Sequence, residues 1–333
     1  MFKNFLPDFQ LMNLLVTGGA GFIGSHFIRT FIDNHPLDNI VNLDALTYAG
    51  NSDNTTDFEK YLHYTFFKGD IADQELVETI IRDCKIEAIV NFAAETHVDN
   101  SIQNSRPFIH SNVEGVRSLL DAIRKTKIQR FVQISTDEVY GSIENGIFTE
   151  ESPLKPRSPY AASKAAADHF VQAYYETYKI PALITRSSNN FGPRQYPEKY
   201  IPVAVTNLIE GEKIPVYGAG KNIRDWLYVV DNCEAIDTVL HSGKIGEVYN
   251  VSGGNERENI EIARMIAQTF GKNEEAIQFV PDRLGHDFRY ALSHDKIARE
   301  LGWKPRHSFE EALHDTICWY KNNEQWWKKL KQK

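Results

Sequence analysis

The sequence has few of the residues that mark secreted, zinc-binding or membrane-inserted proteins. Only 3 of its 333 residues are cysteine, and Cys84, Cys233 and Cys318 lie far apart with no CxxC motif. This spacing argues against a disulfide framework or a cysteine zinc site and is typical of a reducing compartment. No apolar run reaches the roughly 20 residues that span a membrane. Residues 1–10 lack the regions of a signal peptide, so we expect a cytoplasmic protein.

Positive charge is also scarce, because the formal net charge is −8 at pH 7. This balance argues against a nucleic-acid-binding surface. With 42% hydrophobic and 25% charged residues, the composition is that of an ordinary globular protein. The chain is longer than one hydrophobic core usually fills, so we expect two lobes. Strand and helix patterns alternate without an internal repeat or a low-complexity linker, which predicts an α/β fold with a Rossmann-type, doubly wound parallel sheet.

A glycine-rich turn follows the first predicted strand, residues 13–17, and precedes a helical pattern. Its glycines form a GxxGxxG motif, in which Gly18 permits a tight turn, Gly21 lets the backbone approach a pyrophosphate and Gly24 lets the helix pack on the strand. The second predicted strand ends in Asp44, twenty residues after the last glycine. Its carboxylate can accept from ribose hydroxyls and would repel a 2′-phosphate. The pattern therefore predicts NAD rather than NADP as cofactor.

Two further strands are predicted over residues 66–71 and 88–92, each followed by residues suited to a cofactor pocket. Asp70 and Ile71 could flank the adenine, and the small side chains of Ala93 and Ala94 allow close approach. Helices are expected from about Asp73 to Cys84 and from Phe108 to Lys125. His97 and Asp99 could suggest a metal, but no HExxH motif or Cys/His cluster completes a site, so no metal is predicted.

Polar and ionisable residues appear abruptly where the strand over residues 131–134 ends. The carboxyl ends of strands in an open α/β sheet are where ligands bind. Thr136, Asp137 and Glu138 could therefore supply a hydrogen-bond donor, an acid and a base within one site. The alternative is a loop start in which Asp137 caps a short helix.

A tyrosine and a lysine lie one helical turn apart after the proline-rich loop of residues 150–159. Tyr160 and Lys164 fall on the same face of an alanine-rich helical segment. An ammonium near a phenol favours the phenolate, which would lower the phenol pKa from near 10 and make Tyr160 a general base. The YxxxK pattern is short and also arises by chance on surface helices.

Together these motifs resemble those of the extended short-chain dehydrogenase/reductases and, more narrowly, of the dTDP-glucose 4,6-dehydratases. The resemblance runs from Asn13 to about Trp319. The sequences that carry it are TGGAGFIG, LTYAGN, FAAETHVD, STDEVYG, SPYAASKA, SNNFGPRQYPEKYIP, NIRDWLYV and GHDFRYAL. Epimerases of the same fold do not carry the acidic pair after Thr136. The family usually has Ser, Arg and Pro where this chain has Thr96, Asn100 and Leu284, and these differences bear on the exact substrate.

The resemblance implies a reaction with no net redox change. Tyr160 would take the proton of the sugar C4 hydroxyl while hydride passes from C4 to NAD. Glu138 would then remove the C5 proton, and Asp137 would protonate the C6 hydroxyl as it leaves as water. Hydride returned to C6 gives a 4-keto-6-deoxy sugar. Thr136 would donate to the C4 oxygen, and Lys164 would bind the nicotinamide ribose.

The expected binding residues come partly from the motifs and partly from the resemblance. The cofactor residues are Gly18, Gly21, Phe22, Ile23, Gly24, Asp44, Leu46, Thr47, Asp70, Ile71, Ala93, Ala94, Thr96, Ser111, Tyr160 and Lys164. Arg224 and Arg283 are planar donors suited to a diphosphate. The full set expected to bind the nucleotide sugar is Thr96, Thr136, Asn189, Asn190, Glu198, Lys199, Pro215, Val216, Tyr217, Arg224, Asn259, Arg283, His286 and Tyr290.

The two expected lobes interleave along the chain. Residues 13–186 would form the NAD-binding domain, to which residues 226–254 return with a strand beginning at Trp226. Residues 187–225 and 255–330 would form a smaller α/β lobe that binds the sugar nucleotide. The resemblance also implies a homodimer formed through the Phe108 and Tyr160 helices. The alternatives are a UDP-glucose 4,6-dehydratase, a sugar-nucleotide 4-epimerase or decarboxylase, and a non-enzymatic, NAD-responsive binding protein.

Overall fold

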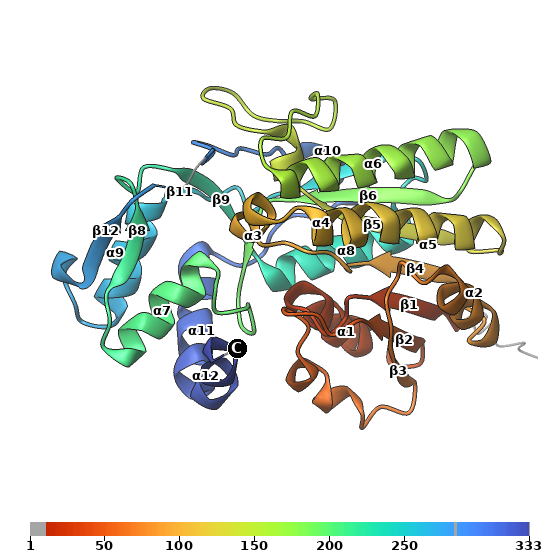
Figure 1. Ribbon diagram of the computed structural model, residues 1–333, viewed down its shortest axis with the longest axis horizontal. Coiled ribbons are helices and arrows are strands. Elements are labelled where there is room, and N and C mark those ends of the chain that lie inside the picture. Colours follow the sequence, from red (N-terminus) through yellow and green to blue (C-terminus); the bar gives the residue numbers. More distant parts are fainter. Residues whose placement is uncertain (1–10, 283–284, 333) are drawn as a thin grey trace, which may run out of the picture.

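The computed structural model describes residues 11–282 and 285–332. Arg283 and Leu284, which entered the sequence analysis, lie outside the described residues. Figure 1 shows a larger part built around one sheet and a smaller part that carries β8, β12, α7 and α9. Within the residues that the structure describes, no helix combines the length and the apolar character that crossing a bilayer requires.

The larger part is organised around a seven-stranded sheet whose strand pairs are all parallel. From one edge to the other, the strands are β10 (Val248–Val251), β6 (Ala182–Ser187), β5 (Arg130–Thr136), β4 (Ala88–Asn91), β1 (Asn13–Thr17), β2 (Asn39–Asp44) and β3 (Tyr64–Lys68). The strand order reverses direction between β1 and β4, and this switch point is where doubly wound sheets bind ligands. The predicted Rossmann-type fold is confirmed.

Helices cover both faces of the sheet, because successive side chains of each buried strand point to opposite faces. Leu14 and Val16 pack on one side with α1 (Phe22–Asn34) and α8 (Val229–Ser242). Leu15 packs on the other side with the helices α2 (Gln74–Asp83), α5 (Gly115–Arg124) and α6 (Pro159–Tyr178). The sheet is therefore largely apolar on both faces, although buried polar side chains such as Asn42 and Gln133 also lie within its strands.

Short elements connect the sheet to the site. They are the helices η1 (Ser52–Asn54), η2 (Thr56–Phe58), α3 (Val98–Gln103), α4 (Arg106–Phe108), η3 (Ile109–Glu114), η4 (Asp137–Tyr140), η5 (Glu274–Ala276) and α10 (Asp295–Leu301). The helix expected from Phe108 to Lys125 is present, but its first part, η3, is a π-helix. Extra-wide turns of this kind are often found at functional sites.

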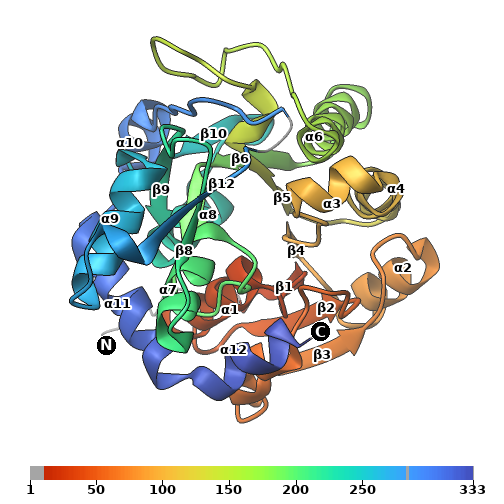
Figure 2. The same ribbon diagram turned by 60° about the vertical axis from the view of Figure 1, so that its left-hand side comes forward.

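The smaller part carries two short sheets. One joins β11 (Glu256–Glu258), β9 (Ile223–Tyr228) and β7 (Asn189–Phe191), and the other joins β12 (Ile277–Val280) and β8 (Ile214–Tyr217). Its helices are α7 (Tyr200–Glu210), α9 (Asn259–Thr269), α11 (Phe309–Asn322) and α12 (Glu324–Lys331). Figure 2 shows α9 and α11 along the outer side of this part, with α8 behind β8 and β9.

One sequence expectation about the returning strand is wrong. The strand that contains Trp226 is β9, and it pairs with β7 and β11 instead of the main sheet. The strand that returns is β10, which pairs with β6. A strand's partner depends on long-range hydrogen bonds, which the local apolar pattern at Trp226 does not encode.

A His–Asp–His cluster joins α1 to α8 on one face of the sheet. Asp237 on α8 lies 3.1 Å from both His35 Nε2 and His241 Nδ1. Burial alone would raise the pKa of Asp237, but hydrogen bonds from the two histidines lower it. The same carboxylate raises the pKa of His241 above its ordinary value of 6.5. Each group therefore stabilises the charged form of its partner.

These shifts predict a pH dependence of stability. The Asp237 contribution is present above the usual carboxyl pKa and is lost as pH falls through the lowered value. The His241 contribution is complete below about 6.5 and is lost as pH rises through the raised value. Chemical denaturation at about pH 5.5 and about pH 8.5 should show a loss of stability on the alkaline side that is smaller in His241→Gln. An identical pH dependence in both proteins would contradict this account.

Candidate active site

The glycine-rich turn between β1 and α1 has no room for side chains. Gly18 has a φ of +70°, and a Cβ there would lie 2.6 Å from the backbone nitrogen of Ala93. A Cβ on Gly24 would collide with the carbonyl oxygen of Gly18. Gly21 lies between them, immediately before the first residue of α1. The turn thus brings backbone N–H groups and the helix N-terminus to the cavity wall, which is the arrangement that binds a pyrophosphate.

The carboxylate at the end of β2 is fixed by two backbone donors. The Ala20 amide donates to Asp44 Oδ2 over 2.9 Å, and the Leu46 amide donates to Oδ1 over 2.7 Å. Burial raises the pKa of Asp44, and these two hydrogen bonds partly offset that rise. The group is thus positioned next to the glycine-rich turn, as a ribose-binding carboxylate must be.

The acidic pair lies where β5 ends and η4 begins. The Thr136 hydroxyl accepts from the Glu138 amide over 3.3 Å, which caps η4. It also donates to Asp137 Oδ1 over 3.2 Å. The helix-capping alternative is thus realised by Thr136 and not by Asp137, whose side chain is left for the cavity. Among the described residues, Asp137 Oδ2 is buried without a hydrogen-bond partner.

Burial is the main reason why Asp137 favours its neutral form. It raises the pKa of this carboxyl well above 3.8, and the negative charges of Glu138 and Asp225 raise it further. Arg224 acts in the opposite direction but does not reverse the shift. This shift favours the neutral form of the carboxyl, which is the form that a general acid needs.

The tyrosine–lysine pair begins α6. Ser158 caps this helix by accepting from the Ala161 amide over 3.0 Å, which places Tyr160 and Lys164 in its first turns. Both side chains are buried and line the same cavity as the acidic pair. Lys164 donates to the Ile134 carbonyl over 2.6 Å, and burial lowers its pKa to about 8.

The expectation that Lys164 lowers the phenol pKa is wrong for this geometry. Burial and the charge of Glu138 raise the pKa of Tyr160, and a hydrogen bond with Thr136 only partly offsets them. The Lys164 ammonium is hydrogen-bonded to the Ile134 carbonyl of β5. The negative charge of the acidic pair opposes ionisation of the phenol. The i, i+4 spacing correctly predicted that Tyr160 and Lys164 lie on one helix beside the same cavity. It could not predict the other groups that surround the phenol.

One cavity of about 310 Å³ brings together most of the predicted site. Its lining contains the five predicted catalytic residues Thr136, Asp137, Glu138, Tyr160 and Lys164. It also contains the predicted cofactor residues Gly18, Gly21, Phe22, Ile23, Gly24, Asp44, Thr47, Asp70, Ile71, Ala93, Ala94, Thr96 and Ser111, and the predicted substrate residues Asn189, Asn190, Glu198 and Lys199. Leu46 lines an adjoining cavity instead.

Buried polar atoms without partners support a polar ligand in this cavity. Among the described lining residues, unpaired atoms occur on Ser135, Asp137, Ser188, Asn189, Asn190 and Gln195. A buried polar group without a hydrogen bond costs free energy. Together with the glycine turn and the fixed carboxylate of Asp44, these atoms fit a dinucleotide and a hydroxyl-rich substrate.

The structure does not bring the other predicted substrate residues into this cavity lining. They are Pro215, Val216, Tyr217, Arg224, Asn259, His286 and Tyr290, all in the smaller part of the molecule, while Arg283 lies outside the described residues. Tyr217 is partly exposed, and its ring lies 6.1 Å from that of His286. His286 is hydrogen-bonded to Asp282 over 2.7 Å.

Arg224, which is expected to bind the diphosphate, also makes hydrogen bonds within the protein. Its guanidinium donates to the backbone carbonyls of Ile223, Asp287 and Phe288 and lies 4.3 Å from the Tyr290 ring. Most of its donors are therefore used within the protein. Tyr290 in turn donates to Asp287 over 2.6 Å.

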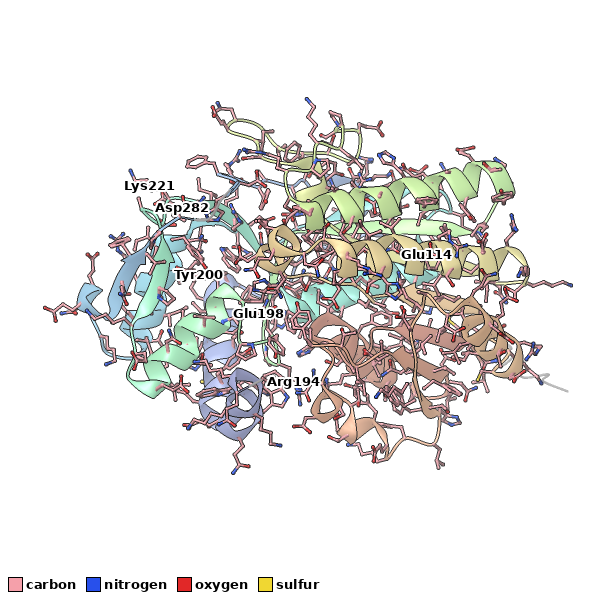
Figure 3. All side chains as sticks on the ribbon, in the orientation of Figure 1. Glu114, Arg194, Glu198, Tyr200, Lys221 and Asp282 are labelled. Atoms are coloured by element: carbon pink, nitrogen blue, oxygen red, sulfur yellow. The ribbon has the colours of Figure 1, made fainter. Side chains whose placement is uncertain are left out.

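A polar cluster at the junction of the two parts was only partly predicted. Glu198 accepts from the Tyr48 hydroxyl over 3.1 Å and lies 3.6 Å from both His97 and Lys199. Lys199 also donates to the Thr96 carbonyl over 3.1 Å. Figure 3 shows Glu198 and Arg194 between the two parts, with Tyr200 farther into the smaller one. Sequence reasoning missed Tyr48, and its only local signal is that it lies in the motif LTYAGN.

Sequence reasoning also missed the residues that form hydrogen bonds to the first turns of α6, where Tyr160 lies. Asn112, in the π-helix η3, donates to the Ser163 hydroxyl over 2.8 Å and accepts from the Glu95 amide over 2.9 Å. The Tyr160 amide donates to the Ser101 hydroxyl over 3.2 Å. These bonds tie the start of α6 to the loop after β4. No local pattern predicts these hydrogen bonds, because each joins residues that are distant in the chain.

The sequence and the fold are similar to those of characterised nucleotide-sugar enzymes. The model of the GDP-mannose 4,6 dehydratase family matches residues 15–316. A low-salt glycan biosynthesis protein of Haloferax volcanii is 52% identical, over 93% of this chain and 98% of its own. A dTDP-glucose 4,6-dehydratase of Streptomyces niveus is 47% identical, over 96% of each chain. The crystal structure of dTDP-glucose 4,6-dehydratase from Bacillus anthracis in complex with NAD superposes with a TM-score of 0.91, at 49% identity, over 96% of this chain and 99% of that one.

The position of Asp44 makes a prediction about the cofactor. Asp44→Ala should weaken NAD binding by about 10- to 100-fold, since charged hydrogen bonds are worth roughly 1.5 to 3 kcal/mol each. The same change should narrow the preference for NAD over NADP, because the repulsion of a 2′-phosphate is lost. Calorimetric titration with both dinucleotides measures this. Unchanged affinity for NAD would contradict the assignment.

Proposed function

Because this chain belongs to the GDP-mannose 4,6 dehydratase family, we propose that it is an NAD-dependent hydro-lyase that converts dTDP-glucose into the 4-keto-6-deoxy sugar and water. The resemblance inferred from the motifs is confirmed by full-length relatives that carry this activity in their names. One structural observation carries the proposal. A buried Asp137, whose pKa is raised and whose Oδ2 atom has no hydrogen-bond partner among the described residues, lies beside Glu138 and Tyr160 in a single cavity.

The first step requires a base at the C4 hydroxyl. Tyr160 takes this proton, and Thr136, hydrogen-bonded to the phenol, donates to the oxygen that becomes the C4 ketone. Bound NAD would supply the hydride acceptor and donor for this chemistry, and its oxidised ring would bring positive charge near the phenol. Since burial and Glu138 raise the phenol pKa, Tyr160 needs nearby positive charge to ionise. Lys164, in the same cavity, is the lysine expected at the nicotinamide ribose.

The second step is the loss of water. The C4 ketone acidifies the C5 proton, and Glu138 removes it. Asp137 gives its proton to the C6 hydroxyl, so that the leaving group is water rather than hydroxide. When hydride reaches C6, Glu138 returns a proton to C5. The two neighbouring carboxyls can hold opposite protonation states because burial and mutual repulsion separate their titrations.

The smaller lobe is proposed to bind the nucleotide diphosphate. Its segments are residues 187–228 and 255–330, because β9 pairs within this lobe, while residues 13–186 are proposed to bind NAD and α8 and β10 complete their sheet and its cover. Tyr217 is the exposed aromatic ring suited to a nucleobase, and His286 lies close to it. The Arg224 guanidinium lies against the Tyr290 ring, so we propose that Arg224 helps to bind the substrate mainly by fixing the position of Tyr290.

The assembly and the cellular location are also proposals. Exposed apolar side chains on the Phe108 and Tyr160 helices support a homodimer, namely Ile109, Phe170 and Tyr178. Three free cysteines support a reducing, cytoplasmic location. Sedimentation of the purified protein at several concentrations would test the dimer.

The acidic pair gives the sharpest test of the mechanism. The double variant Asp137→Asn, Glu138→Gln should still bind NAD and oxidise C4, because Tyr160 and Lys164 remain. It should lose water more than 100-fold more slowly, since general acid and base groups typically contribute 10²–10⁴-fold each. Reduced cofactor should therefore accumulate, which absorbance measures directly.

Two comparisons control this experiment. Tyr160→Phe should show neither reduced cofactor nor product, because it blocks the first step. Product formation by the acidic double variant at the wild-type rate would disprove the roles of both carboxyls.

The nucleotide sugar is predicted to be the thymidine form. The wild-type protein should convert dTDP-glucose faster than UDP-glucose, giving a product lighter by one water with a methyl group at C5. Mass spectrometry and NMR of the products measure this. A C4-epimerised product that keeps its C6 oxygen would favour the epimerase alternative.

A further inference from the structure

The helix α12 contacts the loop next to the glycine-rich turn, from the opposite end of the chain. Trp326 donates its indole N–H to the Asn54 side-chain oxygen over 3.1 Å. Lys329 lies 3.3 Å from Asp53. Both partners belong to η1. Figure 1 shows α12 beside α11, near the junction of the two lobes.

Asn54 passes this contact on to the glycine-rich turn. Its side chain is buried, and its side-chain amide donates to the Ala20 carbonyl over 3.0 Å. The backbone amide of Asn51 donates to the same carbonyl over 3.1 Å. The Ala20 amide donates to Asp44. A continuous path of hydrogen bonds therefore runs from Trp326 through Asn54 and Ala20 to the carboxylate expected to bind the ribose.

Side chains of α12 also form part of the cavity walls. Trp326 lines the main cavity, and Leu330 and Lys331 line the adjoining one. Trp327 is fully buried and donates to the Tyr320 carbonyl on α11 over 2.9 Å, which fixes the helix in place. The ion pair between Lys329 and Asp53 is exposed and contributes little. The contact of α12 that can affect the glycine-rich turn is therefore the hydrogen bond from Trp326 to Asn54.

We propose that α12 retains the dinucleotide, with Trp326 as a positioning residue that fixes Asn54 and, through it, the glycine-rich turn. The inference rests on the proposed function, in which hydride must return to the sugar from which it came. Release of the reduced cofactor before that point would leave an oxidised sugar and an enzyme unable to finish the cycle. A helix that fixes the binding turn slows that release.

Trp326→Phe tests the proposal because it removes the N–H donor and keeps an aromatic ring. The protein is loaded with isotope-labelled NAD and chased with excess unlabelled NAD. Label should leave the variant about tenfold faster than the wild type, the factor that one net hydrogen bond of typical strength contributes. Asn54→Ala, which breaks the same path at its next residue, should have an effect of the same direction and at least the same size.

Lys328→Ala is the matched control, since the interactions of this exposed residue with Glu324 and with the Trp327 ring both lie within α12. It should exchange NAD at the wild-type rate. Thermal unfolding without added NAD shows whether each variant is folded. Wild-type exchange in Trp326→Phe, or equal acceleration in Lys328→Ala, would overturn the proposal.

A turnover measurement separates this inference from the proposed function. In excess NAD, Trp326→Phe should still dehydrate dTDP-glucose but should require more NAD than the wild type for its half-maximal rate. It should also release more reduced cofactor per turnover. Failure of the wild type itself to dehydrate dTDP-glucose would overturn the proposed function, while the exchange rates would still test the role of α12.

Discussion

The proposed chemistry depends on one buried carboxyl that favours its neutral form beside another carboxyl. Asp137 directly follows β5, where the polypeptide leaves a largely apolar sheet, and its side chain is buried. Burial raises its pKa first, and Glu138 and Asp225 add repulsion. Asp225 is itself buried and has a pKa raised to about 6. Repulsion among three neighbouring acidic groups disfavours the ionisation of all three. Their burial and their neighbouring charges determine which group favours its neutral form.

The fold places this group where a sugar can reach both it and the redox centre. The carboxyl ends of β1, β4 and β5 meet at the switch point of the sheet, so the glycine turn, the loop after β4 and the acidic pair line one cavity. The start of α6 adds Tyr160 and Lys164 from the neighbouring helix. A reaction that oxidises one carbon and eliminates at the next two needs this proximity.

Local patterns predicted the parts of the site that are local in structure. The glycine motif, Asp44 at a strand end and the Tyr160–Lys164 spacing all depend on backbone geometry within a few residues, and the structure has each of them. The pairing of β9, the carbonyl partners of Arg224 and the anchoring of Lys164 on Ile134 depend on residues distant in the chain. The π-helix η3 and the position of Trp326 likewise have no local signature. Residue types thus predicted the chemistry, whereas long-range hydrogen bonds decided which side chains remain available for it.

The protonation state of Asp137 can be observed directly. Infrared difference spectra of protein labelled with ¹³C-aspartate, recorded near pH 7 against Asp137→Asn, report the C=O stretch of a neutral carboxyl. The account predicts a protonated aspartate band that is absent from Asp137→Asn. The absence of that band from the wild type, with Asp137 ionised at neutral pH, would contradict it.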